Sequence, residues 1–196
     1  HACGKKSGTA EVCAFVSFGR QGRFLSSGGI SMPNMNWAAL SRESRQKLGA
    51  YGEYFAKMEL TSYGLDVYTS EVDDRGIDFV CLNGRQLLKI QVKSVQKRTG
   101  YAFVKRRYFD ITDECLYLML LIFEQGRLPA PYLIPASAWR QENDLLKYHP
   151  YDSSGQASEP EYGINLSAKN QSLLEEYRLE RVLSGLLGEN LPIQPV

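Results

Sequence analysis

Four side chains between residues 53 and 93 could bind a divalent metal ion and act on a phosphate ester. Asp78 offers a carboxylate oxygen and Gln91 an amide oxygen, and both are hard donors suited to Mg²⁺ or Mn²⁺. Glu53 could add a second carboxylate, directly or through water. Lys93 would place an ammonium beside the ion, where it can orient an attacking water and stabilise charge growing on a phosphate. The alternative is an ordinary Asp–Lys pair across two surface strands.

Three of these residues belong to a predicted β-hairpin. Asn83-Gly84 separates two apolar, β-rich runs, which is the strongest short-range signal for a hairpin. With these two residues as the loop, Asp78 falls opposite Lys89, and Gln91 falls opposite Gly76. Directly opposed residues share a face of a sheet. One face is therefore predicted to carry Asp78, Lys89, Gln91 and Lys93, and the other Ile77, Phe79, Cys81, Leu88, Ile90 and Val92.

A long helical pattern over residues 41–63 precedes the hairpin, with apolar residues stepping by three and four. Glu53 lies on the line of Gly49 and Ala56, a strip of small residues beside the main apolar stripe. A helix can approach a sheet closely along such a strip, so Glu53 could face the site. The alternative is an exposed Glu53–Lys57 pair, worth a few tenths of a kcal/mol.

Residues 97–108 combine cations with aromatic rings. The cations are Lys97, Arg98, Lys105, Arg106 and Arg107, and the rings are Tyr101, Phe103 and Tyr108. One interpretation is a solvated edge strand, since lysine is a common device for protecting an exposed edge. The other is a ribbon that contacts phosphates and carries rings able to stack on bases. The residues of this segment favour neither interpretation.

Composition limits the remaining possibilities. The chain has 196 residues, 43% of them hydrophobic, enough for one domain with a buried core. A net charge of +1 excludes a global attraction to nucleic acid or membranes, so any polyanion site must be local. The cysteines show no paired spacing, which is typical of a reducing compartment such as the cytoplasm. No apolar run approaches the ~20 residues of a membrane helix.

The rest of the chain predicts one domain over residues 41–190, with a disordered extension over 1–40 and a loose tail over 191–196. Further strands are expected at 65–72, 115–123 and 131–135, and helices at 136–146 and from Ser167 to Leu187. The segment 151–161 is expected to be a surface loop, and His149 to lie in a loop.

The order of these motifs resembles the PD-(D/E)xK nuclease superfamily, which includes restriction enzymes, archaeal Holliday-junction resolvases and certain intron-encoded homing endonucleases. The resemblance is carried by Gly52-Glu53, Gly76-Ile77-Asp78 and Ile90-Gln91-Val92-Lys93-Ser94. Ile77 stands where the family motif has its proline. Gln91 replaces the commoner Glu and removes one negative charge, as in some homing endonucleases of the superfamily.

The resemblance implies an α/β, restriction-endonuclease-like fold, in which a mixed β-sheet is flanked by helices, and metal-dependent hydrolysis of DNA phosphodiesters. It implies Asp78, Gln91 and Glu53 as ligands of Mg²⁺ (or Mn²⁺) and Lys93 as the catalytic lysine. The five cations of residues 97–107 would position the DNA backbone. Cleavage of both strands needs two sites, so a homodimer or a dimer of dimers is expected. The competing interpretation, raised by Gln91, is a nuclease-like module that binds DNA or a protein without cutting.

Overall fold

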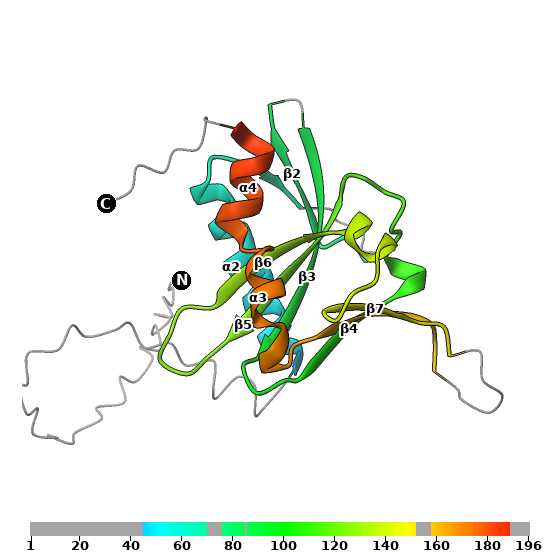
Figure 1. Ribbon diagram of the computed structural model, residues 1–196. Helices are drawn as coiled ribbons and strands as arrows, with labels where there is room; N and C mark the ends of the chain where they lie inside the picture. Colours follow the sequence, from blue (N-terminus) through cyan, green and yellow to red (C-terminus); the bar gives the residue numbers. More distant parts are fainter. Residues whose placement is uncertain (1–44, 70–75, 85, 152–157, 189–196) are drawn as a thin grey trace, which may run out of the picture. The chain divides into compact units, whose positions relative to one another are not determined.

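The computed structural model describes residues 45–69, 76–84, 86–151 and 158–188 (Figure 1). The strands are β1 (Asp66–Tyr68), β2 (Phe79–Asn83), β3 (Gln86–Gln96), β4 (Tyr101–Lys105), β5 (Leu116–Phe123), β6 (Ala130–Pro135), β7 (Leu146–His149) and β8 (Glu161–Asn165). The helices are α2 (Arg45–Ser62), α3 (Gln171–Glu175) and α4 (Leu179–Leu187), with 3₁₀ turns η1 (Arg106–Tyr108), η2 (Ala136–Arg140) and η3 (Ala168–Asn170).

These elements form one α/β domain with two sheets. The larger sheet has the strand order β1-β2-β3-β5-β6 and the smaller one β4-β8-β7. The larger sheet is mixed, because β3 is antiparallel to β2 and parallel to β5. Helices α2 and α4 contribute to the core on one face, and the smaller sheet contributes to the core on the other. The predicted mixed sheet flanked by helices is therefore confirmed.

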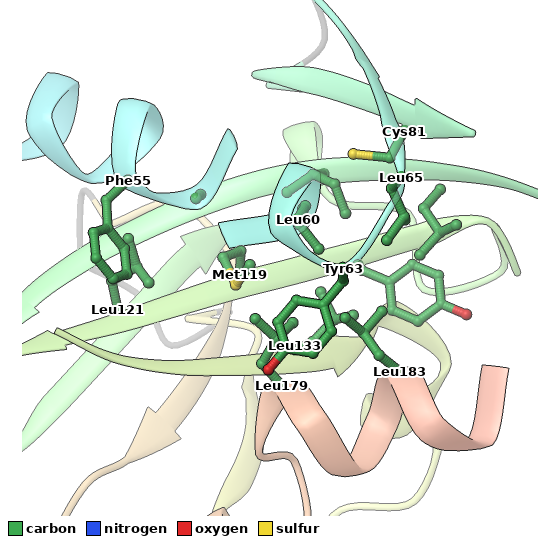
Figure 2. Close-up of a cluster of buried hydrophobic side chains, with 14 of the residues drawn as sticks. Phe55, Leu60, Tyr63, Leu65, Cys81, Met119, Leu121, Leu133, Leu179 and Leu183 are labelled. Atoms are coloured by element: carbon green, nitrogen blue, oxygen red, sulfur yellow. The ribbon is translucent and has the colours of Figure 1, made fainter. Parts of the chain in front are cut away.

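Strand β5 lies at the centre of the domain, and all eight of its residues are buried. Side chains alternate across a strand, so β5 supplies both cores. Met119 and Leu121 pack beneath the helices with Leu179 and Leu183 of α4 (Figure 2). The intervening leucines pack against the smaller sheet. A strand buried on both faces reads as a continuous apolar run, which is how the sequence predicted it.

The predicted hairpin forms, but its register differs. Asn83 is still paired in the ladder, so the loop begins at Gly84, one residue later than predicted. Gly84 has a φ of 56°, a left-handed conformation that glycine adopts without strain and that such short loops need. The ladder is therefore shifted by two residues, and Val80 lies opposite Lys89, in the position predicted for Asp78.

A shift by two residues leaves each strand side chain on its predicted face, because side chains alternate with a period of two. Phe79, Cys81, Leu88 and Ile90 all lie in the core beneath the helices. Ile77 is the exception, since it precedes β2 and packs with the other core.

Helix α2 packs closely on the larger sheet because it carries a glycine at the contact. A Cβ on Gly52 would lie 1.9 Å from Ser94 Oγ and 3.2 Å from Leu121 Cδ1. The helix ends at Ser62, and Gly64 follows it with a φ of 81° and donates its N–H to the carbonyl of Thr61, as is typical of a glycine after a helix C-terminus.

Three predicted elements differ in the C-terminal half. The expected helix over 136–146 is only the 3₁₀ turn η2, followed by strand β7, which includes His149. The expected loop over 151–161 ends in the first residue of strand β8. The expected helix from Ser167 to Leu187 is broken, because Arg178 pairs with β6 across Tyr132. In each case contacts between distant segments override the local pattern.

Several predictions fall outside the described residues: the extension over 1–40, the start of the first helix and the tail over 191–196. The first strand is short, and only its segment β1 is described as strand. Among the described helices, none is long and apolar enough to span a membrane.

We expect Gly52→Val to destabilise the fold by about 1–3 kcal/mol, because overpacking of the helix–sheet contact must displace Ser94 or Leu121. Gly49→Val is the matched control: it makes the same change three residues earlier, where a Cβ meets nothing within 4 Å. Urea unfolding of both variants checks the prediction. Equal midpoints for the two variants would contradict the close approach of α2.

Candidate functional site

Asp78 lies at the point where the chain enters the hairpin. Its backbone N–H donates to the carbonyl of Ile90 at 2.9 Å, and its carboxylate Oδ2 accepts the backbone N–H of Val92 at 2.5 Å. Strand β2 begins only at Phe79, so no carbonyl of β2 reaches the N–H of Val92 on β3. The Asp78 carboxylate accepts that N–H in its place. Because Val92 lies between Gln91 and Lys93, this bond holds the carboxylate beside both residues.

Gln91 presents a buried oxygen with no partner. Its Oε1 is buried and has no hydrogen bond to any described residue. Its Nε2 lies 3.3 Å from the position of a Cβ on Gly76, whose φ of 69° requires glycine. A buried carbonyl oxygen without a partner costs about 1–3 kcal/mol, so such an atom in a native fold calls for an unseen partner. A divalent cation beside the Asp78 carboxylate fits that requirement.

Lys93 shares a face of the sheet with Gln91. The two residues pair with Leu118 and Leu120 of β5, which belong to the core facing the smaller sheet. The Lys93 Nζ lies 5.0 Å from the centre of the Phe103 ring, within range of a cation–π interaction. Burial lowers the pKa of Lys93, and the negative charge of Glu161 partly opposes this.

Glu161 is a residue of the site that the sequence analysis missed. It is 7% exposed and accepts hydrogen bonds from the hydroxyls of Tyr101 and Tyr151 at 2.7 and 2.9 Å. Burial, and then the bond to Glu161, raise the pKa of Tyr101. Glu161 had been placed at the end of a surface loop, and only the pairing of β8 with β4 brings it near Lys93. No local signal could have found it.

Glu53 lies on the opposite side of the larger sheet from Lys93, since α2 packs on the other face. It is half-buried and makes no hydrogen bond or ion pair with another described residue, so the alternative pair with Lys57 does not form. Gly49, one turn earlier on α2, lines a groove together with Val92 and Lys93. Strand β2 does not pair with this part of β3. The assignment of Glu53 as a metal ligand stays a prediction.

Two grooves border the polar face of β3. The first has a volume of 660 Å³ and is lined by Lys93, Arg98, Tyr101 and Phe103, and by Arg45 at the start of α2. The second has a volume of 370 Å³ and lies beside Lys89. It is lined by Arg106, Arg107 and Tyr108 among others.

The five predicted DNA-contacting cations are therefore divided. Arg98 belongs to the first groove, and Arg106 and Arg107 to the second. Lys105 and Arg107 also pair with the exposed carboxylate of Glu159, at 2.8 and 2.7 Å. Lys97 lines a separate pocket with three glutamates, away from this site.

No group of three or more His, Cys, Asp or Glu side chains that could hold a metal is present among the described residues. The predicted ligand set is of another kind, since it has two carboxylates and one amide.

No protein-family model matches the sequence, and no curated protein matches it either. Two nucleases are among the solved structures that are similar to this chain. One is the Holliday junction resolvase Hjc of Archaeoglobus fulgidus, an archaeal hyperthermophile, with 15% identity, a TM-score of 0.43, and coverage of 68% of this chain and 93% of that chain.

The other solved structure is a bacterial homing endonuclease, with 19% identity, a TM-score of 0.46, and coverage of 75% of this chain and 94% of that chain. Both belong to the kinds of nuclease that the sequence motifs resemble. At these identities and TM-scores neither protein's activity transfers to this chain, and the proposal below depends on the residues of the site itself.

Lys93→Met should raise the melting temperature by about 2–4 °C, because burial disfavours the charged lysine while methionine retains the apolar stem. The folded chain holds the pKa of Lys93 below its ordinary 10.5. The charged lysine therefore lowers the free energy of unfolding at every pH at which Lys93 is protonated in the unfolded chain. The gain should therefore be present at neutral pH and disappear as the pH rises past 10.5. Thermal unfolding against pH measures it.

Lys97→Met is the control for this prediction, since Lys97 is exposed. Its melting temperature should stay unchanged. A Lys93→Met protein that melts below the parent at neutral pH would show that the charge of Lys93 stabilises the fold.

Proposed function

We propose that this chain is a metal-dependent DNA endonuclease that hydrolyses phosphodiester bonds at Asp78, Gln91, Lys93 and Glu53. The observation that carries the proposal is the buried Oε1 of Gln91, which has no partner among the described residues. It lies on the strand to which the Asp78 carboxylate is bonded, two residues before a half-buried lysine. Because most buried polar atoms of native proteins have a hydrogen-bond partner, this oxygen favours an unseen ligand.

Asp78 and Gln91 would hold Mg²⁺ or Mn²⁺, with Glu53 reaching it from α2, directly or through water. When bound, the ion would act as a Lewis acid on the phosphate and orient it for attack. The chain's own contribution is to fix the ligands. The bond from Val92 holds the Asp78 carboxylate, and the close packing at Gly76 confines the Gln91 amide.

Lys93 would act on the reacting phosphate itself. Its ammonium lies on the same face as the Gln91 amide, where it can donate to a phosphate oxygen and orient the attacking water. The Phe103 ring and Glu161 both favour the charged form, against the effect of burial. A buried ammonium stabilises developing negative charge more strongly than a solvated one, because less water screens it.

The DNA backbone would lie along the two grooves on either side of Gln91. Arg45 and Arg98 supply positive charge in one groove and Arg106 and Arg107 in the other. The pairs of Lys105 and Arg107 with Glu159 are solvent-exposed and worth little, so phosphates can replace that carboxylate. One site cuts one strand, so we propose a homodimer or a dimer of dimers for cleavage of both strands.

Lys93→Ala and Asp78→Ala should each slow cleavage of plasmid DNA in Mg²⁺ by about 100-fold or more, since each removes a group that acts on the reacting phosphate or holds the ion. Lys89→Ala is the matched control. It removes a lysine whose partner is Asp113 at 2.7 Å and which lines the second groove, so it can weaken DNA binding but should leave the cleavage rate at saturating DNA unchanged. The proposal fails if all three variants cut as fast as the parent.

Calorimetric titration with Mn²⁺ separates the nuclease from the module that binds without cutting. The parent should bind Mn²⁺, Asp78→Asn should abolish the binding, and Gln91→Glu should tighten it by restoring one negative charge. Absence of any binding that depends on Asp78 would favour the inert module.

A further inference from the structure

Two exposed aromatic residues, Tyr101 and Phe103, form a surface that the proposed hydrolysis does not use. They are 39% and 38% exposed, although large aromatic side chains are usually well buried. Their rings are nearly parallel, with centroids 6.2 Å apart and an interplanar angle of 26°. They alternate along β4 with Ala102 and Val104, which face the core. We call this pair the aromatic platform.

The platform is held in place by the smaller sheet. The Tyr101 ring lies over the bare backbone of Gly163 on β8, where a Cβ would come within 2.1 Å of the hydroxyl and 2.6 Å of the ring. The hydroxyl is bonded to Glu161, and the ring meets His149 edge-on at 6.0 Å. A ring fixed before binding loses little conformational entropy when a ligand stacks on it.

The platform lies next to the proposed catalytic lysine and in a cationic groove. Phe103 is 5.0 Å from Lys93 Nζ, and both rings line the 660 Å³ groove. The charged residues lining this groove are Arg45, Lys93 and Arg98, and none of its described lining residues is acidic. Glu161 lies behind Tyr101, and hydroxyl groups cover its carboxylate.

A third cavity, distinct from the two grooves described above, has a different charge pattern. The 400 Å³ pocket that includes Lys97, just after β3, is also lined by Glu59, Glu124 and Glu180 and by Arg127 and Arg178. Its mixed charges give no preference for a polyanion. The platform groove thus combines aromatic faces with cations alone, the pairing that proteins use to bind single-stranded nucleic acid.

We propose that the aromatic platform binds an unpaired nucleobase next to the scissile phosphate, so that the substrate is DNA with unpaired nucleotides near the cleavage site. This proposal rests on the proposed function, since it uses Lys93 as the group that contacts the phosphate. In duplex DNA the bases are stacked inside the helix and the phosphates face outward. A ring beside the group that contacts the phosphate can therefore stack only on a base that has left the helix.

The test measures DNA binding by the full chain in EDTA, where no cleavage occurs. The probes are a short duplex and the same duplex with unpaired nucleotides at its centre, one of them 2-aminopurine, whose fluorescence falls when it stacks. The parent should bind the second probe about 5- to 150-fold more tightly and quench its fluorescence, as expected for one stacked base. Tyr101→Ala/Phe103→Ala should lose both the preference and the quenching, with duplex affinity unchanged.

Two variants serve as controls. Tyr101→Phe keeps the ring and should keep both the preference and the quenching, even if loss of the bond to Glu161 lowers thermal stability. Arg98→Ala should weaken binding to both probes by the same factor and reduce the salt dependence, because it removes a phosphate contact. Equal affinity of the parent for both probes, or a preference that survives in the double alanine variant, would overturn the proposal. Failure of the proposed function would show separately, as a parent that binds DNA but does not cut it in Mg²⁺.

Discussion

The candidate site depends on the unequal pairing of strand β3 with its two neighbours. Pairing with β5 continues to Gln96, whereas pairing with β2 stops at Ile90. Beyond that point the backbone of β3 lacks a β2 strand as partner, and a buried N–H without an acceptor is costly. The Asp78 carboxylate supplies the acceptor at Val92. The same requirement of the backbone thus places an acid beside Gln91 and Lys93.

The burial of the site follows from the burial of β5. A strand that is apolar on both sides must be covered on both sides, here by helices on one face and by the smaller sheet on the other. The smaller sheet also covers the face of β3 that carries Gln91 and Lys93. It thereby desolvates the lysine, lowers its pKa and deprives the glutamine oxygen of water. The core and the burial of these polar groups have the same physical origin.

The smaller sheet also adds residues of its own. Glu161 and Tyr101 come from β8 and β4, whose pairing joins segments about sixty residues apart in the chain. The glycine at 163 leaves room for the tyrosine ring, and the ring covers the carboxylate. Lys93 therefore lies beside the ring of Phe103, the buried acid Glu161 and the cationic groove. Of these, only the groove residue Arg98 is close to Lys93 in sequence.

The sequence by itself determined the features that depend on local periodicity and turn chemistry. It predicted the hairpin, the shared face of Gln91 and Lys93 and the strand β5, but it placed the close approach of the helix on the strip of Gly49 and Ala56, whereas the tight contact lies at Gly52. It did not determine the register, because a shift of two residues leaves the hydrophobic pattern unchanged, and only the pairing of Asn83 with Gln86 in the folded hairpin distinguishes the two.

The tertiary structure decided everything that depends on pairing between distant segments. It placed α2 on the face opposite Lys93, made strands of β7 and β8, and broke the last predicted helix at Arg178. Short segments such as β8 carry weak local preferences, so their structure is set by the partner that they find. For the same reason Glu161 could be located only in the folded chain, since its role comes from two tyrosine hydroxyls and a lysine charge and not from its sequence neighbours.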